Sequence, residues 1–160
     1  MSPSSISREM KSGEWIVSLS NNQSVHAVDE RQLLDAVRAV LEDSAFVSAE
    51  ISLAVVDDPT IHDLNRRFLK HDWPTDVLSF VLDDRNAHLE GEVILSADTA
   101  AAEAAEIGWS ASAEQLLYVI HGTLHLIGYR DKSEQETAAM RAAEERYLDH
   151  FGYRQPDAPH

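Results

Sequence analysis

Hydrophobic and polar positions follow two periods along this chain, one typical of strands and one typical of helices. Residues 15–21 (WIVSLSN) alternate weakly, and residues 51–57 (ISLAVVD) are largely β-branched and apolar, so both segments are predicted to be strands. Two further strands are predicted by VLSFVLD, from Val77, and GEVILS, from Gly91. The link between these last two is short enough for an antiparallel pair.

Apolar residues at helical spacing predict three helices in the first two thirds of the chain. The first begins at Asp29, which can form a capping box with Gln32, and runs to about residue 44. The second begins at Asp58, with a proline at the first helical position, and should end before Pro74. An alanine-rich helix then begins at Asp98 and ends near residue 108.

Two more helices are predicted near the C-terminus. Ser112 and Gln115 can form a capping box for a helix that is apolar nearly all round, should be buried, and ends near Gly128. Ser133 and Glu136 can cap the last helix in the same way. Together the elements predict an α+β fold, with a small mixed four-stranded sheet packed against about five helices.

Length and composition predict one globular domain. The chain has 160 residues, of which 44% are hydrophobic, enough for a substantial core. Polar composition predicts a flexible N-terminus over residues 1–13 and a flexible tail over residues 154–160. The single domain is therefore expected to span residues 14–153.

The charge balance alone argues against a nucleic-acid partner. The formal net charge is −15, which would repel phosphates. The basic residues are unevenly spread, however: Arg66, Arg67 and Lys70 lie within five positions, and Arg130 and Lys132 lie close together. Either a local basic patch on an acidic protein or a set of solvated surface charges fits this pattern.

Two sequence features predict a cytoplasmic protein. The first 15 residues lack the apolar core of a secretory signal, and no apolar run approaches the roughly 18 residues of a membrane span. The chain also has no cysteine, so a zinc ion could be held only by nitrogen and oxygen.

The segment with the most specific chemistry is HGTLHLIGYRD, residues 121–131. His121 and His125 lie four positions apart and therefore on one face of a helix. Burying two imidazoles in an apolar helix costs free energy unless each finds a partner, and a divalent cation can partner both. Beyond the break at Gly128, Asp131 can bring an oxygen to the same point.

Two interpretations of this segment are open from the residues alone. In the first, His121, His125 and Asp131 hold a metal ion with one position vacant, the pattern of a catalytic zinc site. In the second, the histidines are core residues bonded to other protein groups, and Asp131 caps the next helix. A stable domain without metal is thus an alternative.

The same segment resembles the signature of the YbeY endoribonucleases, H-G-x-L-H-L-x-G-Y followed two residues later by a third ligand. Two other blocks are similar to that family as well: Leu64-Asn65 with the segment from Pro74 to Phe80, and Gly91-Glu92-Val93-Ile94. The blocks occur in the family's order between about residues 50 and 150.

This resemblance implies a zincin-like α+β fold, one zinc ion per chain and metal-dependent cleavage of single-stranded RNA. It also implies a role in ribosomal RNA maturation, chiefly at the small-subunit 3′ end, and in ribosome quality control, with ribosomal RNA and the ribosome or ribosomal proteins as partners. The metal ligands carried over are His121, His125 and Asp131.

Two positions depart from the family pattern. The third ligand is usually histidine and is Asp131 here, which can still bind zinc but makes the metal less Lewis acidic. A family arginine thought to serve the reaction corresponds to Leu69, which cannot bind phosphate. Arg66, Arg67 or Lys70 are the candidates for a replacement cation that binds the substrate.

Two functions therefore remain as hypotheses: a zinc-dependent endoribonuclease and a non-catalytic, metal-binding ribosome-assembly factor. Peptide hydrolysis is disfavoured, because a metalloprotease of the HExxH type carries glutamate after the first histidine, and this chain carries Gly122. A nuclease would have to rely on metal activation alone, on the RNA 2′-hydroxyl as nucleophile, or on an acid such as Asp76 or Glu92, and the sequence leaves all three routes open.

Overall fold

The computed structural model describes residues 14–69 and 76–156, and at residues 68 and 69 it describes the backbone only. Four strands form one sheet in the order β1-β2-β4-β3. Their bounds are β1 (Glu14–Asn21), β2 (Ser48–Val56), β3 (Val77–Asp83) and β4 (His88–Ser96). The β1–β2 and β2–β4 pairs are parallel and the β3–β4 pair is antiparallel, so the sheet is mixed as predicted.

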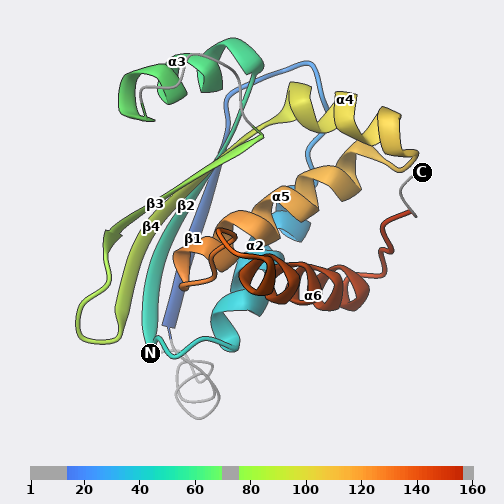
Figure 1. The fold of residues 1–160 in the computed structure, drawn as a ribbon. Coiled ribbons are helices and arrows are strands. Elements are labelled where there is room, and N and C mark those ends of the chain that lie inside the picture. Colours follow the sequence, from blue (N-terminus) through green and yellow to red (C-terminus); the bar gives the residue numbers. More distant parts are fainter. Residues whose placement is uncertain (1–13, 70–75, 157–160) are drawn as a thin grey trace.

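Within the described residues, five helices accompany this sheet, as the sequence predicts. They are α2 (Glu30–Glu42), α3 (Asp58–Leu69), α4 (Ala97–Ile107), α5 (Ala111–Leu126) and α6 (Glu134–His150). Helices α2, α5 and α6 lie on one face of the sheet, and α3 lies beyond one of its ends (Figure 1). The predicted α+β class, with four strands and five helices, is confirmed.

The main core fills the space between the sheet and α2, α5 and α6. It contains inward-facing strand residues such as Leu53 and Val93 together with Leu116, Ile120 and Leu124 of α5. A smaller cluster of Val56, Ile61 and Leu78 joins α3 to the end of the sheet. None of the helices in the described ranges is both long enough and apolar enough to cross a membrane.

Helix α5 is central because it packs on the sheet and on three other helices. Its buried residues lie on nearly all sides, as expected for a sequence that is apolar nearly all round. Gly122 lets α5 approach closely: a Cβ atom at this position would lie 2.7 Å from Val93 Cγ1 and 3.0 Å from Ser79 Oγ. The Ser79 hydroxyl also donates a hydrogen bond to the Gly122 carbonyl at 3.1 Å. These contacts fix the turn of α5 that carries the motif histidines.

Several predicted element boundaries are wrong by a few residues. Helix α5 is capped by Ser110, which accepts a hydrogen bond from the Ala113 N–H at 3.0 Å, and not by the predicted box of Ser112 and Gln115. Gln115 is instead buried, and its amide donates to the Ala27 carbonyl at 3.2 Å. The first turn of α5 therefore begins earlier, which leaves Ser112 inside the helix.

The other boundary differences have similar local causes. Helix α4 is capped by Ser96 and begins one residue before the predicted Asp98, whose carboxylate accepts a hydrogen bond from the Asp58 N–H. Strands β2 and β4 both begin three residues earlier than predicted, at Ser48 and His88, because these two residues pair with each other in register. The predicted capping box of Ser133 with Glu136 is confirmed.

Candidate metal centre

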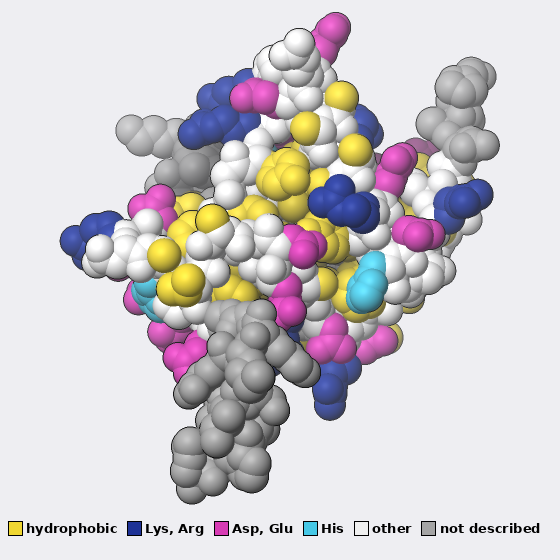
Figure 2. Space-filling view, turned by 90° about the horizontal axis from the view of Figure 1, so that it is seen from below, with side chains coloured by type: hydrophobic (Ala, Val, Ile, Leu, Met, Phe, Trp, Pro, Cys, Tyr) yellow, Lys and Arg dark blue, Asp and Glu magenta, His cyan; other side chains and the backbone are white. Residues whose placement is uncertain are grey.

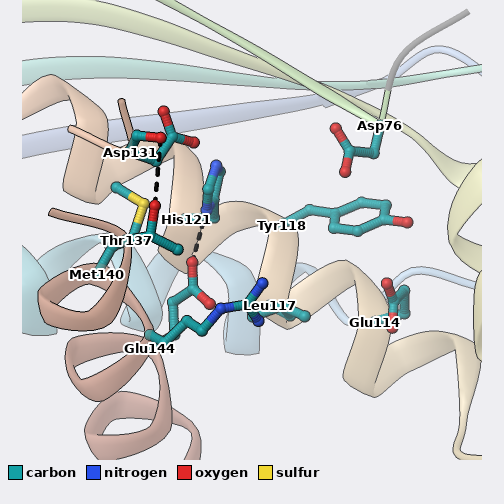
Figure 3. A pocket seen from close by; sticks show the side chains of 10 residues that line it. Asp76, Glu114, Leu117, Tyr118, His121, Asp131, Thr137, Met140 and Glu144 are labelled. Carbon is teal, nitrogen blue, oxygen red and sulfur yellow. Dashed lines mark hydrogen bonds and ion pairs between the residues drawn. The ribbon is translucent and has the colours of Figure 1, made fainter. Parts of the chain in front are cut away.

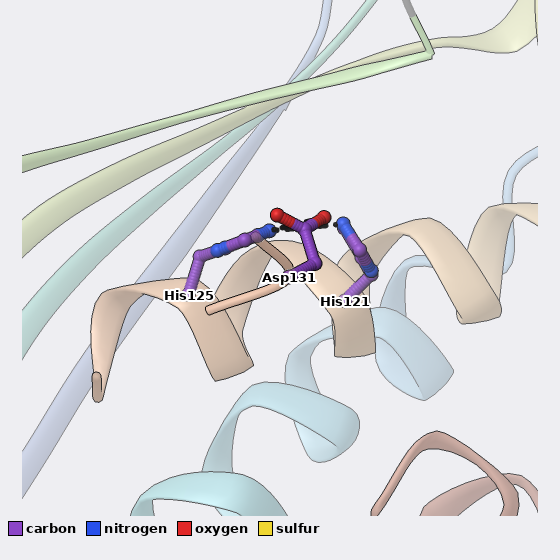
Figure 4. A group of neighbouring side chains, drawn as sticks. All are labelled: His121, His125 and Asp131. Atoms are coloured by element: carbon purple, nitrogen blue, oxygen red, sulfur yellow. Dashed lines mark hydrogen bonds and ion pairs between the residues drawn. The ribbon is translucent and has the colours of Figure 1, made fainter. Parts of the chain in front are cut away.

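The last turns of α5 and the loop that follows bring three potential metal ligands together. Nε2 of His125 lies 3.1 Å from Nε2 of His121 and 3.6 Å from Oδ2 of Asp131. One ligand atom from each of the three residues lies within 4.8 Å of the other two. Figure 4 shows both rings turned toward the Asp131 carboxylate, which lies over the helix between them. The predicted convergence of these side chains is therefore confirmed.

The chain returns to the helix because α5 ends in a tight turn. Gly128 has a φ of 113°, a left-handed conformation that favours glycine, and the next amide, of Tyr129, donates to the Leu124 carbonyl at 3.0 Å. Asp131 follows this turn, and its carbonyl accepts a hydrogen bond from the Thr137 hydroxyl on α6 at 3.3 Å. Both ends of the loop are thus tied to neighbouring helices.

Each histidine has an acceptor at the ring nitrogen that faces away from the cluster. Nδ1 of His121 lies 2.6 Å from Oε2 of Glu144 on α6, and Nδ1 of His125 lies 3.1 Å from the Tyr129 carbonyl. A carboxylate and a carbonyl only accept hydrogen bonds, so each Nδ1 carries the proton. In the neutral rings both Nε2 atoms then present lone pairs, as in histidines that bind a metal.

The donor set fits a divalent cation. Two zinc–nitrogen bonds of about 2.0–2.1 Å that meet at a tetrahedral angle separate their donor atoms by about 3.3 Å. The two Nε2 atoms lie 3.1 Å apart, His125 and Asp131 lie 3.6 Å apart, and the ligand atoms of all three residues lie within 4.8 Å of one another. Without a proton or a cation between them, two facing Nε2 lone pairs would repel each other. The group of His121, His125 and Asp131 can therefore hold a metal ion.

The electrostatics around His121 favour positive charge. Burial by itself lowers the pKa of His121, but the hydrogen bond and charge of Glu144, together with the charges of Asp76 and Asp131, outweigh burial and leave that pKa raised. Glu144 is only 13% exposed, so its charge is weakly screened. The same negative surroundings that stabilise an imidazolium would stabilise a cation at Nε2.

A pocket of about 210 Å³ opens beside His121. Asp131, Thr137 and Met140 line it on the α6 side and Asp76, Glu114 and Tyr118 line it along α5 and the start of β3 (Figure 3).

Glu114 is a buried acid in this pocket. Its carboxylate accepts a hydrogen bond from Nε1 of Trp109 at 2.6 Å. Burial raises the pKa of Glu114, and burial likewise raises the pKa of Tyr118. Glu114 therefore holds its proton to a higher pH than an exposed glutamate does, at the end of the pocket away from His121.

Two of the three predicted substrate-binding cations, Arg66 and Arg67, lie away from the pocket beside His121. Arg66 and Arg67 are exposed on α3, and their guanidinium groups pair with Asp63 at 2.8 and 3.3 Å. Neither lines the pocket beside His121. Lys70 lies outside the described residues, as does the side chain of Leu69. A role for Arg66, Arg67 and Lys70 in RNA binding stays a prediction.

The two candidate acids differ in position. Asp76 lines the pocket. Glu92 lies on β4 between the buried residues Gly91 and Val93, and so points to the face of the sheet opposite α5. Glu92 is therefore not at the centre.

Sequence reasoning missed Glu144 and Glu114. Glu114, Tyr118, His121 and His125 follow each other by four, three and four positions along α5, a spacing that places all of them on one helix face. That spacing could have identified Glu114. No local pattern pointed to Glu144, because it reaches His121 only through the packing of α6 on α5.

Comparison with known proteins identifies the family. A family model described as Endoribonuclease YbeY matches residues 18–152. The protein named Endoribonuclease YbeY from Rhodopirellula baltica is 41% identical over 121 residues, which make up 69% of this chain and 62% of that protein, so the chain spans less than two thirds of this relative.

Other relatives are matched over most of their length. The proteins of the same name from Pelotomaculum thermopropionicum and Moorella thermoacetica are 38% and 36% identical, over 82% and 86% of this chain and 94% and 97% of theirs. The solution structure of TM1509 from Thermotoga maritima shares the fold, with a TM-score of 0.57 and 24% identity over 84% of this chain and 87% of that one. The family model covers most of the sequence and these relatives exceed 30% identity, so the chain belongs to the YbeY family of endoribonucleases.

Proposed function

We propose that this protein is a metal-dependent endoribonuclease that cleaves single-stranded RNA and holds one zinc ion through Nε2 of His121, Nε2 of His125 and the carboxylate of Asp131. One observation carries the proposal: the two Nε2 atoms lie 3.1 Å apart with their lone pairs facing, while both Nδ1 atoms are engaged elsewhere. Three protein ligands leave a coordination position open, as in catalytic zinc sites.

A zinc ion at this centre supplies a Lewis acid next to a pocket that can receive a phosphodiester. The protein's own residues orient and limit that chemistry. Glu144 and the Tyr129 carbonyl hold the two imidazoles in one tautomer and one direction. Two acids line the same pocket: Asp76, and Glu114, whose pKa is raised by burial, so both are candidates for moving a proton there.

The geometry of α5 also disfavours peptide hydrolysis. In a metalloprotease of the HExxH type, a glutamate after the first histidine deprotonates the attacking water. The corresponding position is Gly122, where even a Cβ atom would lie 2.7 Å from Val93 Cγ1. A side chain at this position would force α5 or the sheet to shift, and glycine itself supplies no base for that route.

Family membership supports ribosomal RNA as the substrate and the ribosome as the partner. We therefore propose a role in ribosomal RNA maturation, chiefly at the small-subunit 3′ end, and a location in the cytoplasm. Participation in ribosome quality control stays a prediction. Acidic side chains are scattered among hydrophobic ones over the face in Figure 2, and the formal net charge is −15, so RNA binding requires local positive charge.

The test compares RNA cleavage by the purified protein with and without a chelator. We expect cleavage of a single-stranded oligoribonucleotide, little cleavage of a duplex, and loss of activity on chelation or in His121→Ala. Residual activity in His121→Ala would indicate a contaminating ribonuclease. RNA binding without cleavage, unchanged by that substitution, would instead identify a ribosome-assembly factor.

The metal is tested separately by elemental analysis of protein purified without added metal. About one equivalent of zinc per chain is expected, and less than about a tenth of an equivalent of any transition metal in folded protein would rule out the centre.

A further inference from the structure

Two pockets meet at the metal centre, one on each side of Asp131. The pocket of about 210 Å³ contains His121, and a second pocket of about 200 Å³ contains His125. Asp131 lines both. An extended ligand that occupied both pockets would therefore pass directly over the three potential metal ligands.

Each pocket carries basic side chains. Arg141 is the arginine that lines the His121 pocket, together with four acids: Asp76, Glu114, Asp131 and Glu144. Arg130 and Lys132 line the His125 pocket. The basic residues thus lie on both sides of the centre, although the protein as a whole is strongly acidic.

The helical period explains why Arg141 faces the centre. Thr137, Arg141 and Glu144 follow each other by four and three positions on α6, so they share the face of that helix that packs against α5. Glu144 binds Nδ1 of His121 from this face, and Thr137 binds the carbonyl of Asp131. Arg141 lies between these two anchors, one turn from each.

These three cations are available to a ligand. All three residues are exposed, and none of their side chains forms an ion pair within the described ranges 14–69 and 76–156. By contrast, Arg66 and Arg67 both pair with Asp63 on their own helix.

We infer that a single RNA strand crosses the metal centre from one pocket to the other, with its phosphates held by Arg141 on the His121 side and by Arg130 and Lys132 on the His125 side. This inference rests on the proposed nuclease function and adds the path of the substrate to it. Guanidinium groups bind phosphate through paired, charge-assisted hydrogen bonds, and contacts on both sides of the scissile bond would fix its register over the centre. An acidic protein cannot attract RNA with its overall field, so these local contacts must supply most of the affinity.

The test measures RNA binding by metal-loaded protein. The probe is a fluorescent 2′-O-methyl oligoribonucleotide, checked by gel for integrity, and the readouts are the Kd and its dependence on salt. We expect Arg130→Gln/Lys132→Gln/Arg141→Gln to weaken binding about 100-fold, and the slope of log K against log salt to fall by about 2 for three lost contacts to a single strand. Zinc content should stay at the wild-type level because none of the three residues is a ligand.

A charge-matched control separates specific contacts from general electrostatics. Arg31→Gln/Arg38→Gln/Arg154→Gln removes the same charge from residues that line neither pocket, and should weaken binding less than about threefold. Equal losses in the two triple variants, or no loss in either, would overturn the inference.

Variants that change one pocket at a time test whether the RNA strand crosses the metal centre. Arg141→Gln alone and Arg130→Gln/Lys132→Gln alone should each lose part of the affinity, and Arg141→Lys should recover part of what Arg141→Gln loses. A loss confined to one pocket would overturn a path across the centre. Wild-type protein that cleaves RNA while all variants bind normally would refute the path and leave the nuclease function standing, whereas wild-type protein that neither binds nor cleaves RNA would refute both.

Discussion

The carboxylate of Glu144 lies 2.6 Å from Nδ1 of His121, and it reaches that ring from a different helix, 23 positions further along the chain. This contact couples the packing of α6 on α5 to the direction in which His121 presents Nε2. A carboxylate in this place also makes the imidazole a more basic ligand. The arrangement of the candidate metal centre therefore depends on the C-terminal helix, although the group of His121, His125 and Asp131 includes no residue of that helix.

The first prediction concerns this contact. Glu144→Ala should lower metal affinity by about 10- to 100-fold, the usual cost of losing a group that orients a metal-binding histidine. Glu144→Gln keeps an acceptor without the charge and should cost less. Affinity is measured by competition with a chromophoric chelator. The neighbouring, exposed Glu145→Gln is the matched control, and equal affinities in Glu144→Ala and Glu145→Gln would contradict the role of Glu144.

The second prediction is a pH dependence of opposite sign for folding and for metal binding. The pKa of His121 in the folded, metal-free protein is raised above its ordinary value of 6.5, so the charged ring contributes stability that is fully present below pH 6.5 and lost as pH rises through the raised pKa. Metal binding needs deprotonated Nε2 and should strengthen over the same window.

This pH dependence can be measured by following the Tm of chelator-treated protein and its metal affinity between about pH 5 and 9. The NMR titration of the His121 ring gives the pKa directly. Glu144→Gln should move that titration toward 6.5 and flatten both curves, because Glu144 supplies the largest favourable interaction with the charged ring. A His121 titration at or below 6.5 in wild-type protein would contradict the expectation.

Much of the fold follows from local patterns in the sequence. Alternation and β-branching predict all four strands, and the short link from β3 to β4 predicts their antiparallel pairing. The Ser133–Glu136 capping box is correct because both partners lie within one helical turn. The box at Ser112 fails because Ser110 offers the same chemistry two residues earlier, and a sequence pattern does not rank two adjacent caps.

The residues of the candidate metal centre also fall into two groups, those that a local sequence pattern predicts and those that only the packing of distant helices brings together. His121 and His125 are predictable from helical spacing, and Asp131 from the turn at Gly128, since all three lie within eleven positions. Glu144 reaches His121, and Arg141 reaches the pocket, only because α6 packs on α5. No short segment of the sequence predicts that packing. Sequence reasoning therefore found the three potential ligands but missed the residue that contacts one of them from α6.

The third prediction tests Asp131 as the third ligand. Asp131→His should retain about one metal equivalent, because imidazole is also a zinc ligand, and Asp131→Ala should weaken binding. Because the side chain of Asp131 is exposed, the fold should remain intact in both variants, which Tm measurements check. Equal metal affinity in wild type and Asp131→Ala would remove Asp131 from the ligand set.

The last prediction concerns Gly122 and tests how closely α5 packs on the sheet. Gly122→Ala would place a Cβ atom 2.7 Å from Val93 Cγ1, and Val93 is fully buried on β4, so α5 or the sheet must shift. Overpacking of this kind typically costs about 1–3 kcal/mol, which should exceed the gain of up to about 1 kcal/mol from replacing a helical glycine. Urea unfolding at equilibrium gives the net change. Val93→Ala in the same chain should make room for the added methyl group, so the double variant should lose less than the two single losses combined. If Gly122→Ala is as stable as wild type, or if the two losses simply add, the close approach of α5 to the sheet does not limit the residue at position 122.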